Sequence, residues 1–153
     1  MNVHYTPLFP YTPTTLAPFK IIPAAHVTAD SGTGLVHCAP AHGAEDYLAF
    51  KHLGLLRSQT PDTAQSEGKY PIVSHVDGEG KFDKSIVDIV GVDLGKRLIG
   101  LEVLGDGAKV MREVLVNERR VVSEKEIRHR YPYDWKTGKP VIVRWAFSTL
   151  SGR

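Results

Sequence analysis

The stretch GTGLVHCAPAHGAEDY (residues 32–47) gathers the side chains whose types and spacing could do chemistry. Two histidines, the single cysteine and two adjacent carboxylates surround a bend rich in glycine, alanine and proline: His37, Cys38, His42, Glu45 and Asp46. Imidazole, thiolate and carboxylate groups serve proteins as acids, bases, nucleophiles and metal ligands. The stretch is therefore the candidate functional site.

Phosphate and metal binding are the first two chemistries to weigh. Gly32 and Gly34 have the spacing of a dinucleotide fingerprint, but they precede an expected strand and a proline, whereas that fingerprint opens a helix. This difference excludes the phosphate loop. Zinc would use His37, Cys38 and His42, with Asp46 as a further candidate ligand, yet no second Cys or His cluster completes a structural site. A metal-dependent hydrolase stays a third alternative.

The cysteine and the carboxylates favour other roles. Cys38 could be a nucleophile paired with His42, but small apolar neighbours favour a packed thiol. Glu45 and Asp46 are adjacent on an expected helix, so their side chains diverge by about 100° and cannot flank one bond as an acid and base pair. Both could simply favour the positive end of the helix. Alternatively, one carboxylate points into a pocket walled by the strand of His37, a geometry that suits a bound ammonium group.

Local patterns predict the elements that position these side chains. Leu35 and Val36 predict a strand that ends at Pro40, and the segment between Gly43 and Gly54 predicts a helix. Five prolines between residues 5 and 23 predict an irregular or extended N-terminal segment, with a short strand at Ile21 and Ile22.

The second half of the chain predicts a hairpin, a helix and a final strand. YPIVSHVDGEGKF predicts a hairpin with its turn at residues 77–80, and residues 141–144 predict a strand after a turn at 137–139. Val110, Met111, Val114 and Leu115 form one apolar face, which predicts a helix from Asp106, its expected N-cap, to about Arg120.

Composition sets wide limits. The 153 residues, 42% hydrophobic and 24% charged, suit one globular domain. The net charge is +2 and there is no basic tail, so any contact with RNA would depend on basic residues that lie together locally. One cysteine excludes an internal disulfide and fits a reducing compartment. No apolar stretch approaches the roughly 18 residues of a membrane span, and we expect no membrane partner.

The motif resembles the editing-domain signature of isoleucyl-tRNA synthetases, in which GTG, a hydrophobic residue, VH, a small residue, AP, a small residue, HG and a later DY follow in this order. The valyl and leucyl enzymes share only part of it. Further similarity lies in HVDGEGKF, Val90-Gly91 and HRYPYDWKTGKPVIVR, whose YPYDW form is similar to the bacterial and organellar type. The resemblance spans residues 20–144.

The resemblance implies a fold and a domain layout. The fold would be α/β, an incomplete β-barrel-like editing domain of the valyl, leucyl and isoleucyl type, with mixed strands and flanking helices. A proline-rich segment at residues 1–20 would precede the C-terminal portion of the connective editing domain at residues 21–128. Residues 129–153 would connect towards the synthetic domain.

The resemblance also implies an activity, the hydrolysis of mischarged Val-tRNA(Ile). One methylene separates valine from isoleucine and is worth only about 1–3 kcal/mol in an apolar pocket, a figure usually illustrated by this family, so a second hydrolytic site raises accuracy. The parent enzyme would perform ATP-dependent isoleucyl-tRNA aminoacylation with ATP and Mg²⁺, and this chain would need no cofactor. Partners would be the tRNA(Ile) 3′ end and the misplaced valine, and the protein would be a monomer in the cytoplasm or, as the organellar type favours, the mitochondrial matrix.

Site roles follow from the same resemblance. Asp46 would bind the α-ammonium of the esterified amino acid, and His37 would line the side-chain pocket and help to exclude isoleucine. The remaining substrate-binding positions would allow tight turns near the ligand or donate hydrogen bonds: Gly32, Thr33, Gly34, His42 and Gly43. His42 would otherwise be a structural hydrogen-bonding residue of the turn.

Departures from the family leave a second hypothesis open. The threonine-rich strand of the editing pocket and both ATP signatures of the synthetic domain are missing, and WAFSTLSGR departs from the family pattern. These departures predict a truncated or misassembled gene product, and the alternative function is a catalytically inactive tRNA- or partner-binding remnant. Tyr131, Tyr133 and Trp135 could stack on the tRNA end or pack at a domain junction. The basic residues around them form a modest patch or only a solvated face: Arg128, Arg130, Lys136 and Lys139.

Overall fold

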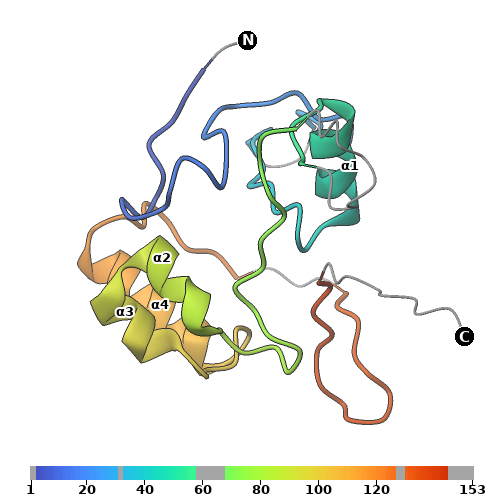
Figure 1. The fold of residues 1–153 in the computed structure, drawn as a ribbon. Helices are drawn as coiled ribbons and strands as arrows, with labels where there is room; N and C mark the ends of the chain where they lie inside the picture. Colours follow the sequence, from blue (N-terminus) through green and yellow to red (C-terminus); the bar gives the residue numbers. More distant parts are fainter. Residues whose placement is uncertain (1–2, 31–32, 58–67, 127–129, 145–153) are drawn as a thin grey trace, which may run out of the picture. The chain divides into compact units, whose positions relative to one another are not determined.

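The structure, a computed structural model, describes residues 3–30, 33–57, 68–126 and 130–144 (Figure 1). These residues form α1 (Ala44–His52), a 3₁₀ turn η1 (Lys84–Ile86), α2 (Val87–Val90), α3 (Val92–Leu98) and α4 (Asp106–Asn117). The chain divides into two compact units, which we call unit 1 (Met1–Ser74 with Val143–Arg153) and unit 2 (His75–Ile142). The domain boundaries expected at residues 20 and 128 stay predictions.

The predicted α/β, β-barrel-like fold is wrong for the part of the chain that the structure describes. This part consists of short helices and irregular backbone, and its only β-type pairings are isolated bridges: His4 with Lys20, Leu56 with Tyr70, Val76 with Phe82, Lys81 with Glu102, and Tyr133 with Pro140. A barrel requires each strand to pair along its length with two neighbours. Leu35 and Val36, where a strand was expected, have no such ladder, and 67% and 58% of their surfaces are exposed.

The N-terminal segment of unit 1 folds back on itself. The Tyr5 amide donates to the Phe19 carbonyl at 2.9 Å, and the Ile21 amide donates to the Val3 carbonyl at 2.8 Å. The Tyr5 and Phe19 rings meet edge to face with centroids 6.0 Å apart. The intervening prolines lack amide donors, so the pairing stops at one bridge, and the prediction of an irregular segment is confirmed.

Helix α1 confirms the prediction for the segment between Gly43 and Gly54. The Tyr47 amide donates to the Gly43 carbonyl at 2.9 Å, which closes the first helical turn. Gly54 has φ +63°, a left-handed conformation that ends the helix and that glycine adopts without a steric cost. The Phe50 side chain is buried.

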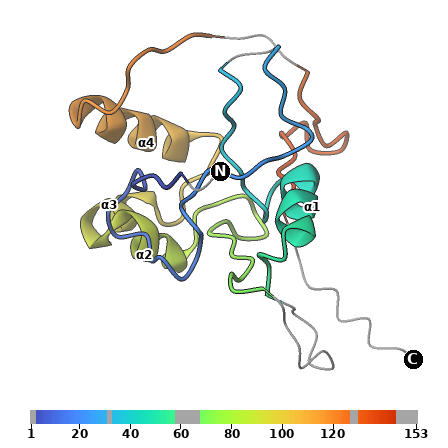
Figure 2. The same ribbon diagram turned by 90° about the horizontal axis from the view of Figure 1, so that it is seen from above.

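In unit 2, α2, α3 and α4 lie together, and α3 contacts both of the others (Figure 1, Figure 2). Gly91 joins α2 to α3 with φ +86° and ψ 165°, a conformation open essentially to glycine. A Cβ at Gly95 would lie 2.5 Å from Val87 Cγ1, so this glycine lets α3 approach α2 closely. Ile86, Val90 and Leu98 form the buried core, and Leu98 has no exposed surface.

The helix and the turns predicted for the second half are present, but the predicted hairpin has one bridge, Val76 with Phe82, in place of paired strands, and residues 141–144 form no strand. Helix α4 begins at Asp106, but Gly105 is its N-cap, and the Asp106 carboxylate accepts from Lys109 Nζ at 2.8 Å. The prediction of Asp106 as the cap is therefore wrong by one residue. The turn at residues 77–80 closes through Gly80 N–H and the Asp77 carbonyl at 3.3 Å, and the turn near Thr137 closes through Gly138 N–H and the Asp134 carbonyl at 2.8 Å.

The helices of the described residues are all too short to cross a lipid bilayer.

Candidate functional site

The candidate site begins with a tight turn before α1. The amides of His42 and Gly43 both donate to the Ala39 carbonyl, at 2.8 and 2.9 Å. Gly43 then takes an extended conformation as the N-cap of α1. This turn returns the chain so that the first turn of the helix faces the backbone at Ala39.

Asp46 lies in that first helical turn and faces the preceding segment. Its Oδ2 accepts the Ala39 amide at 2.9 Å, and only 15% of its side chain is exposed. A Cβ on Gly43 would lie 2.8 Å from Oδ2, so glycine leaves the space that the carboxylate occupies. Glu45, the adjacent carboxylate, is exposed. The two carboxylates thus differ in environment, as their divergence on a helix predicts.

The imidazole that contacts Asp46 belongs to His26. His26 Nε2 lies 3.1 Å from Asp46 Oδ1, and 21% of the His26 side chain is exposed. His26 is not among the residues that the sequence predicts for the site, because a lone histidine in AAHVTADSG has no motif around it. The only available indication was its position shortly before the GTG segment.

His37, the expected partner across from Asp46, is exposed. No hydrogen bond among the described residues involves its ring, so it is free of the contacts that orient Asp46. The structure does not bring the two side chains together by a direct bond. The role of His37 in a side-chain pocket stays a prediction.

Cys38 is a half-buried free thiol beside Asp46. Burial raises the pKa of Cys38 above its ordinary value, and the Asp46 carboxylate raises it further. Partial burial also raises the pKa of Tyr5, with a smaller contribution from Cys38. Because the thiolate is the reactive form, these shifts favour the packed thiol over the nucleophile.

His42 and the glycine segment make local contacts. His42 Nδ1 donates to the Val143 carbonyl at 2.9 Å, which leaves Nε2 to accept from the Ser74 hydroxyl at 3.4 Å. Thr33 Oγ1 accepts the Leu35 amide at 3.3 Å. Gly34 has φ +71°, which favours glycine, and Gly32 lies outside the described residues. None of these contacts tests the predicted substrate-binding roles.

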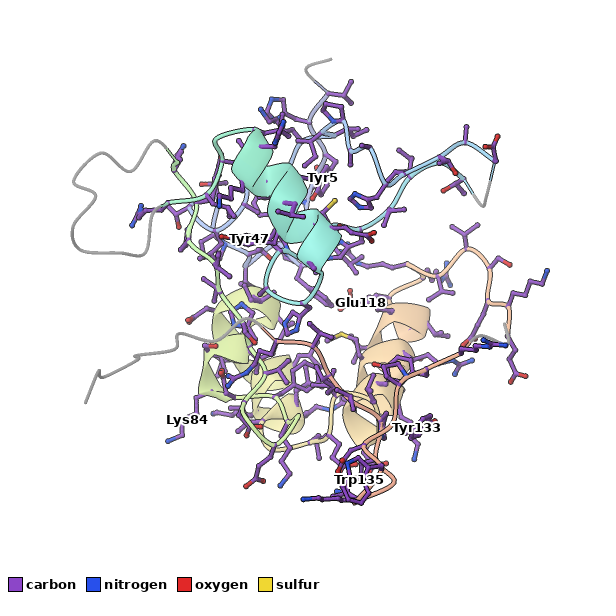
Figure 3. The ribbon with its side chains drawn as sticks, turned by 90° about the vertical axis from the view of Figure 1, so that its right-hand side faces the viewer. Tyr5, Tyr47, Lys84, Glu118, Tyr133 and Trp135 are labelled. Atoms are coloured by element: carbon purple, nitrogen blue, oxygen red, sulfur yellow. The ribbon has the colours of Figure 1, made fainter. Side chains whose placement is uncertain are left out.

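The described ranges hold no metal cluster, whereas the aromatic residues make local ring contacts: the Tyr131 and Tyr133 rings meet edge to face with centroids 6.2 Å apart. Trp135 is 85% exposed and Tyr133 63% exposed, and Figure 3 shows Trp135 at the outer end of its loop. Lys136 Nζ lies 5.2 Å from the centre of the Trp135 ring. Arg128 lies outside the described residues, and the stacking role stays a prediction.

Comparison with known proteins gives relatives but no matching family model. The chain is 40% identical over 126 residues to the mitochondrial isoleucine–tRNA ligase of Schizosaccharomyces pombe, an alignment that covers 82% of this chain and 11% of the relative. It is 40% identical over 119 residues to the isoleucine–tRNA ligase of a Cyanothece species, with 78% and 10% covered. It is 38% identical over 124 residues to the chloroplastic/mitochondrial isoleucine–tRNA ligase of Arabidopsis thaliana, with 81% and 9% covered. The chain thus spans about a tenth of the length of these relatives.

Proposed function

Because this chain is homologous to a segment of bacterial and organellar isoleucine–tRNA ligases, we propose that it corresponds to part of their editing region. Its parental activity would be the hydrolysis of valine wrongly esterified to tRNA(Ile). The parent enzyme would also bind tRNA(Ile), and its synthetic reaction would use ATP and Mg²⁺. We assign neither ATP nor Mg²⁺ to the present chain. Cytoplasm and mitochondrial matrix are both compatible with such relatives, and we propose the matrix.

The observation that supports this proposal is the oriented carboxylate of Asp46. A carboxylate has about four acceptor positions, and the Ala39 amide and His26 use one on each oxygen. The remaining positions suit an ammonium group, which is a strong hydrogen-bond donor with opposite charge. Asp46 would therefore anchor the α-ammonium of the aminoacyl ester and would not act as a general base.

Hydrolysis would then depend mainly on position. An anchored ammonium fixes the ester carbonyl relative to a water molecule, and fixed geometry can supply a large part of a rate enhancement. His37 would act on the other end of the substrate, where an exposed imidazole can approach the aliphatic side chain and disfavour isoleucine. Thr33, Gly34, His42 and Gly43 would shape the backbone around the ester.

The test compares two neighbouring carboxylates. The purified chain is incubated with Val-tRNA(Ile), and deacylation is measured for the wild type, Asp46→Asn and the matched control Glu45→Gln. We expect Asp46→Asn to lower kcat/KM by about tenfold or more, because an ionic hydrogen bond is lost, and Glu45→Gln to retain the wild-type rate. Equal hydrolysis by all three proteins would contradict the anchor role. A wild-type chain that binds tRNA without any turnover would favour the inactive binding remnant.

A further inference from the structure

We infer that His26 is a positioning residue for the Asp46 carboxylate, and that it directs the free acceptor positions of this carboxylate towards an ammonium ligand. The inference rests on the proposed function of Asp46 but adds a residue that neither the motif nor its spacing indicates. It concerns the geometry of the anchor, since His26 would not itself contact the reacting atoms.

The contacts around Asp46 support this role. Oδ2 is fixed by a main-chain donor, the Ala39 amide at 2.9 Å, and Oδ1 lies 3.1 Å from His26 Nε2. Both side chains of the pair are mostly buried, with 21% of His26 and 15% of Asp46 exposed. A bond at this depth competes less with water than a surface pair does.

One bond alone would leave the carboxylate poorly oriented. The terminal torsion of aspartate is broad, so a carboxylate held at a single oxygen can rotate about its Cβ–Cγ bond. A second donor on the other oxygen fixes the plane of the group. Since the Ala39 amide supplies the first donor and the Cys38 thiol is only a weak donor, His26 is the residue whose removal loosens the rotation most.

The chemistry defines which form of His26 is required. To donate to Oδ1, the ring needs a proton on Nε2. A glutamine in place of His26 can donate an amide N–H to Asp46 Oδ1 from the end of its side chain, whereas a leucine has no donor.

The experiment separates orientation of the anchor from general stability. Isothermal titration calorimetry measures binding of two adenosine derivatives, one with a 3′-valylamide and one with the matching 3′-isovaleramide, which lacks only the amine. We expect the wild type to prefer the valylamide, His26→Leu to weaken valylamide binding about tenfold without changing isovaleramide binding, and His26→Gln to restore most of the loss. His52→Leu, at the exposed last turn of α1, is the matched control and should behave as the wild type.

Each outcome bears on a different claim. If Asp46→Asn removes the preference for the amine and His26→Leu keeps it, the inference is overturned and the proposed function stands. If the wild type shows no preference, the anchor role of Asp46 fails, and the inference fails with it. Nitrogen-15 NMR of the wild-type His26 ring at neutral pH gives a result that needs no variant to fold. A proton on Nε2 is expected, and a ring whose Nε2 carries no proton would overturn the inference.

Discussion

Among the single residues, Asp46 and Glu45 show how one step along a helix separates two carboxylates of similar chemistry. Asp46 contacts the Ala39 amide and His26, whereas Glu45 is exposed. That one of the two carboxylates could point inward was an alternative open from the sequence, and the family resemblance singled out Asp46. Its contact with His26 could not be predicted, since the two residues lie 20 positions apart and meet only through the path of the irregular chain between them.

The first prediction uses Cys38, the single cysteine, as a reporter of the Asp46 charge. Iodoacetamide should alkylate Cys38 at pH 8 more slowly in the folded chain than in urea, because burial and Asp46 raise its pKa. Asp46→Asn should increase the folded rate roughly threefold or more, since it removes the carboxylate charge. Mass spectrometry of the modified fraction over time gives the rates.

The shift of Cys38 also has a defined sign for stability. A thiol whose pKa is raised on folding makes its full contribution to stability below its ordinary pKa of 9.0, and this contribution is lost as the pH rises from that value through the higher pKa of the folded state. Glu45→Gln is the control for alkylation and should leave the rate unchanged. An Asp46→Asn rate equal to that of the wild type would show that the charge does not act on the thiol.

The second prediction concerns Gly43. Gly43→Ala would place a Cβ 2.8 Å from Asp46 Oδ2, so the carboxylate must move away from the Ala39 amide. We expect a loss of about 1 kcal/mol in the free energy of unfolding, the usual worth of one hydrogen bond, measured by urea denaturation. Gly78→Ala is the matched control, because no atom lies within 4 Å of its Cβ position. Equal stability of the two variants would contradict the close approach at Gly43.

At the scale of elements, the sequence predicted α1 and α4 because each has an apolar face or clear glycine boundaries. It missed α2 and α3, which are short and are interrupted by Gly91 and Gly95, residues that disfavour helices. Here the close approach of α3 to Val87 requires glycine, so packing outweighs propensity. The predicted strands are absent from the described residues because short β-type patterns form strands only when a partner segment pairs with them.

The third prediction tests the core between these helices. Leu98→Ala should lower the free energy of unfolding by about 2–5 kcal/mol, because a fully buried leucine is replaced and a cavity remains. Leu104→Ala, at a position that is 48% exposed, is the control and should cost less than about 1 kcal/mol. Thermal and urea denaturation followed by circular dichroism measure both. Similar losses in the two variants would contradict the assignment of Leu98 to the core.

At the scale of the whole molecule, burial is unevenly shared between the two units. Of the described residues, the buried hydrophobic ones in unit 1 are Ala41 and Phe50, whereas unit 2 has Val76, Ile86, Val90 and Leu98. Apolar burial is the main stabilising contribution to folding. Unit 2 is therefore expected to be the more stable part, although the proposed chemistry lies in unit 1.

The fourth prediction follows from this difference. Hydrogen exchange monitored by mass spectrometry should show the slowest amides in α3 and the adjoining part of unit 2, and faster exchange in α1. Addition of the 3′-valylamide of adenosine should slow exchange in α1 and at residues 35–43 while leaving unit 2 unchanged. Slower exchange in α1 than in α3 without ligand would contradict the expected order of stability.

The bond from the Ala39 amide to Asp46 has a consequence for natural variation at position 39. The donor is a main-chain group, so any amino acid except proline can supply it, whatever its side chain. Related sequences can therefore differ at this position and still preserve the contact. Variation of the side chain at position 39 would therefore not mean that its backbone is unconstrained. A proline at this position, directly before Pro40, would remove the amide N–H and the contact with it.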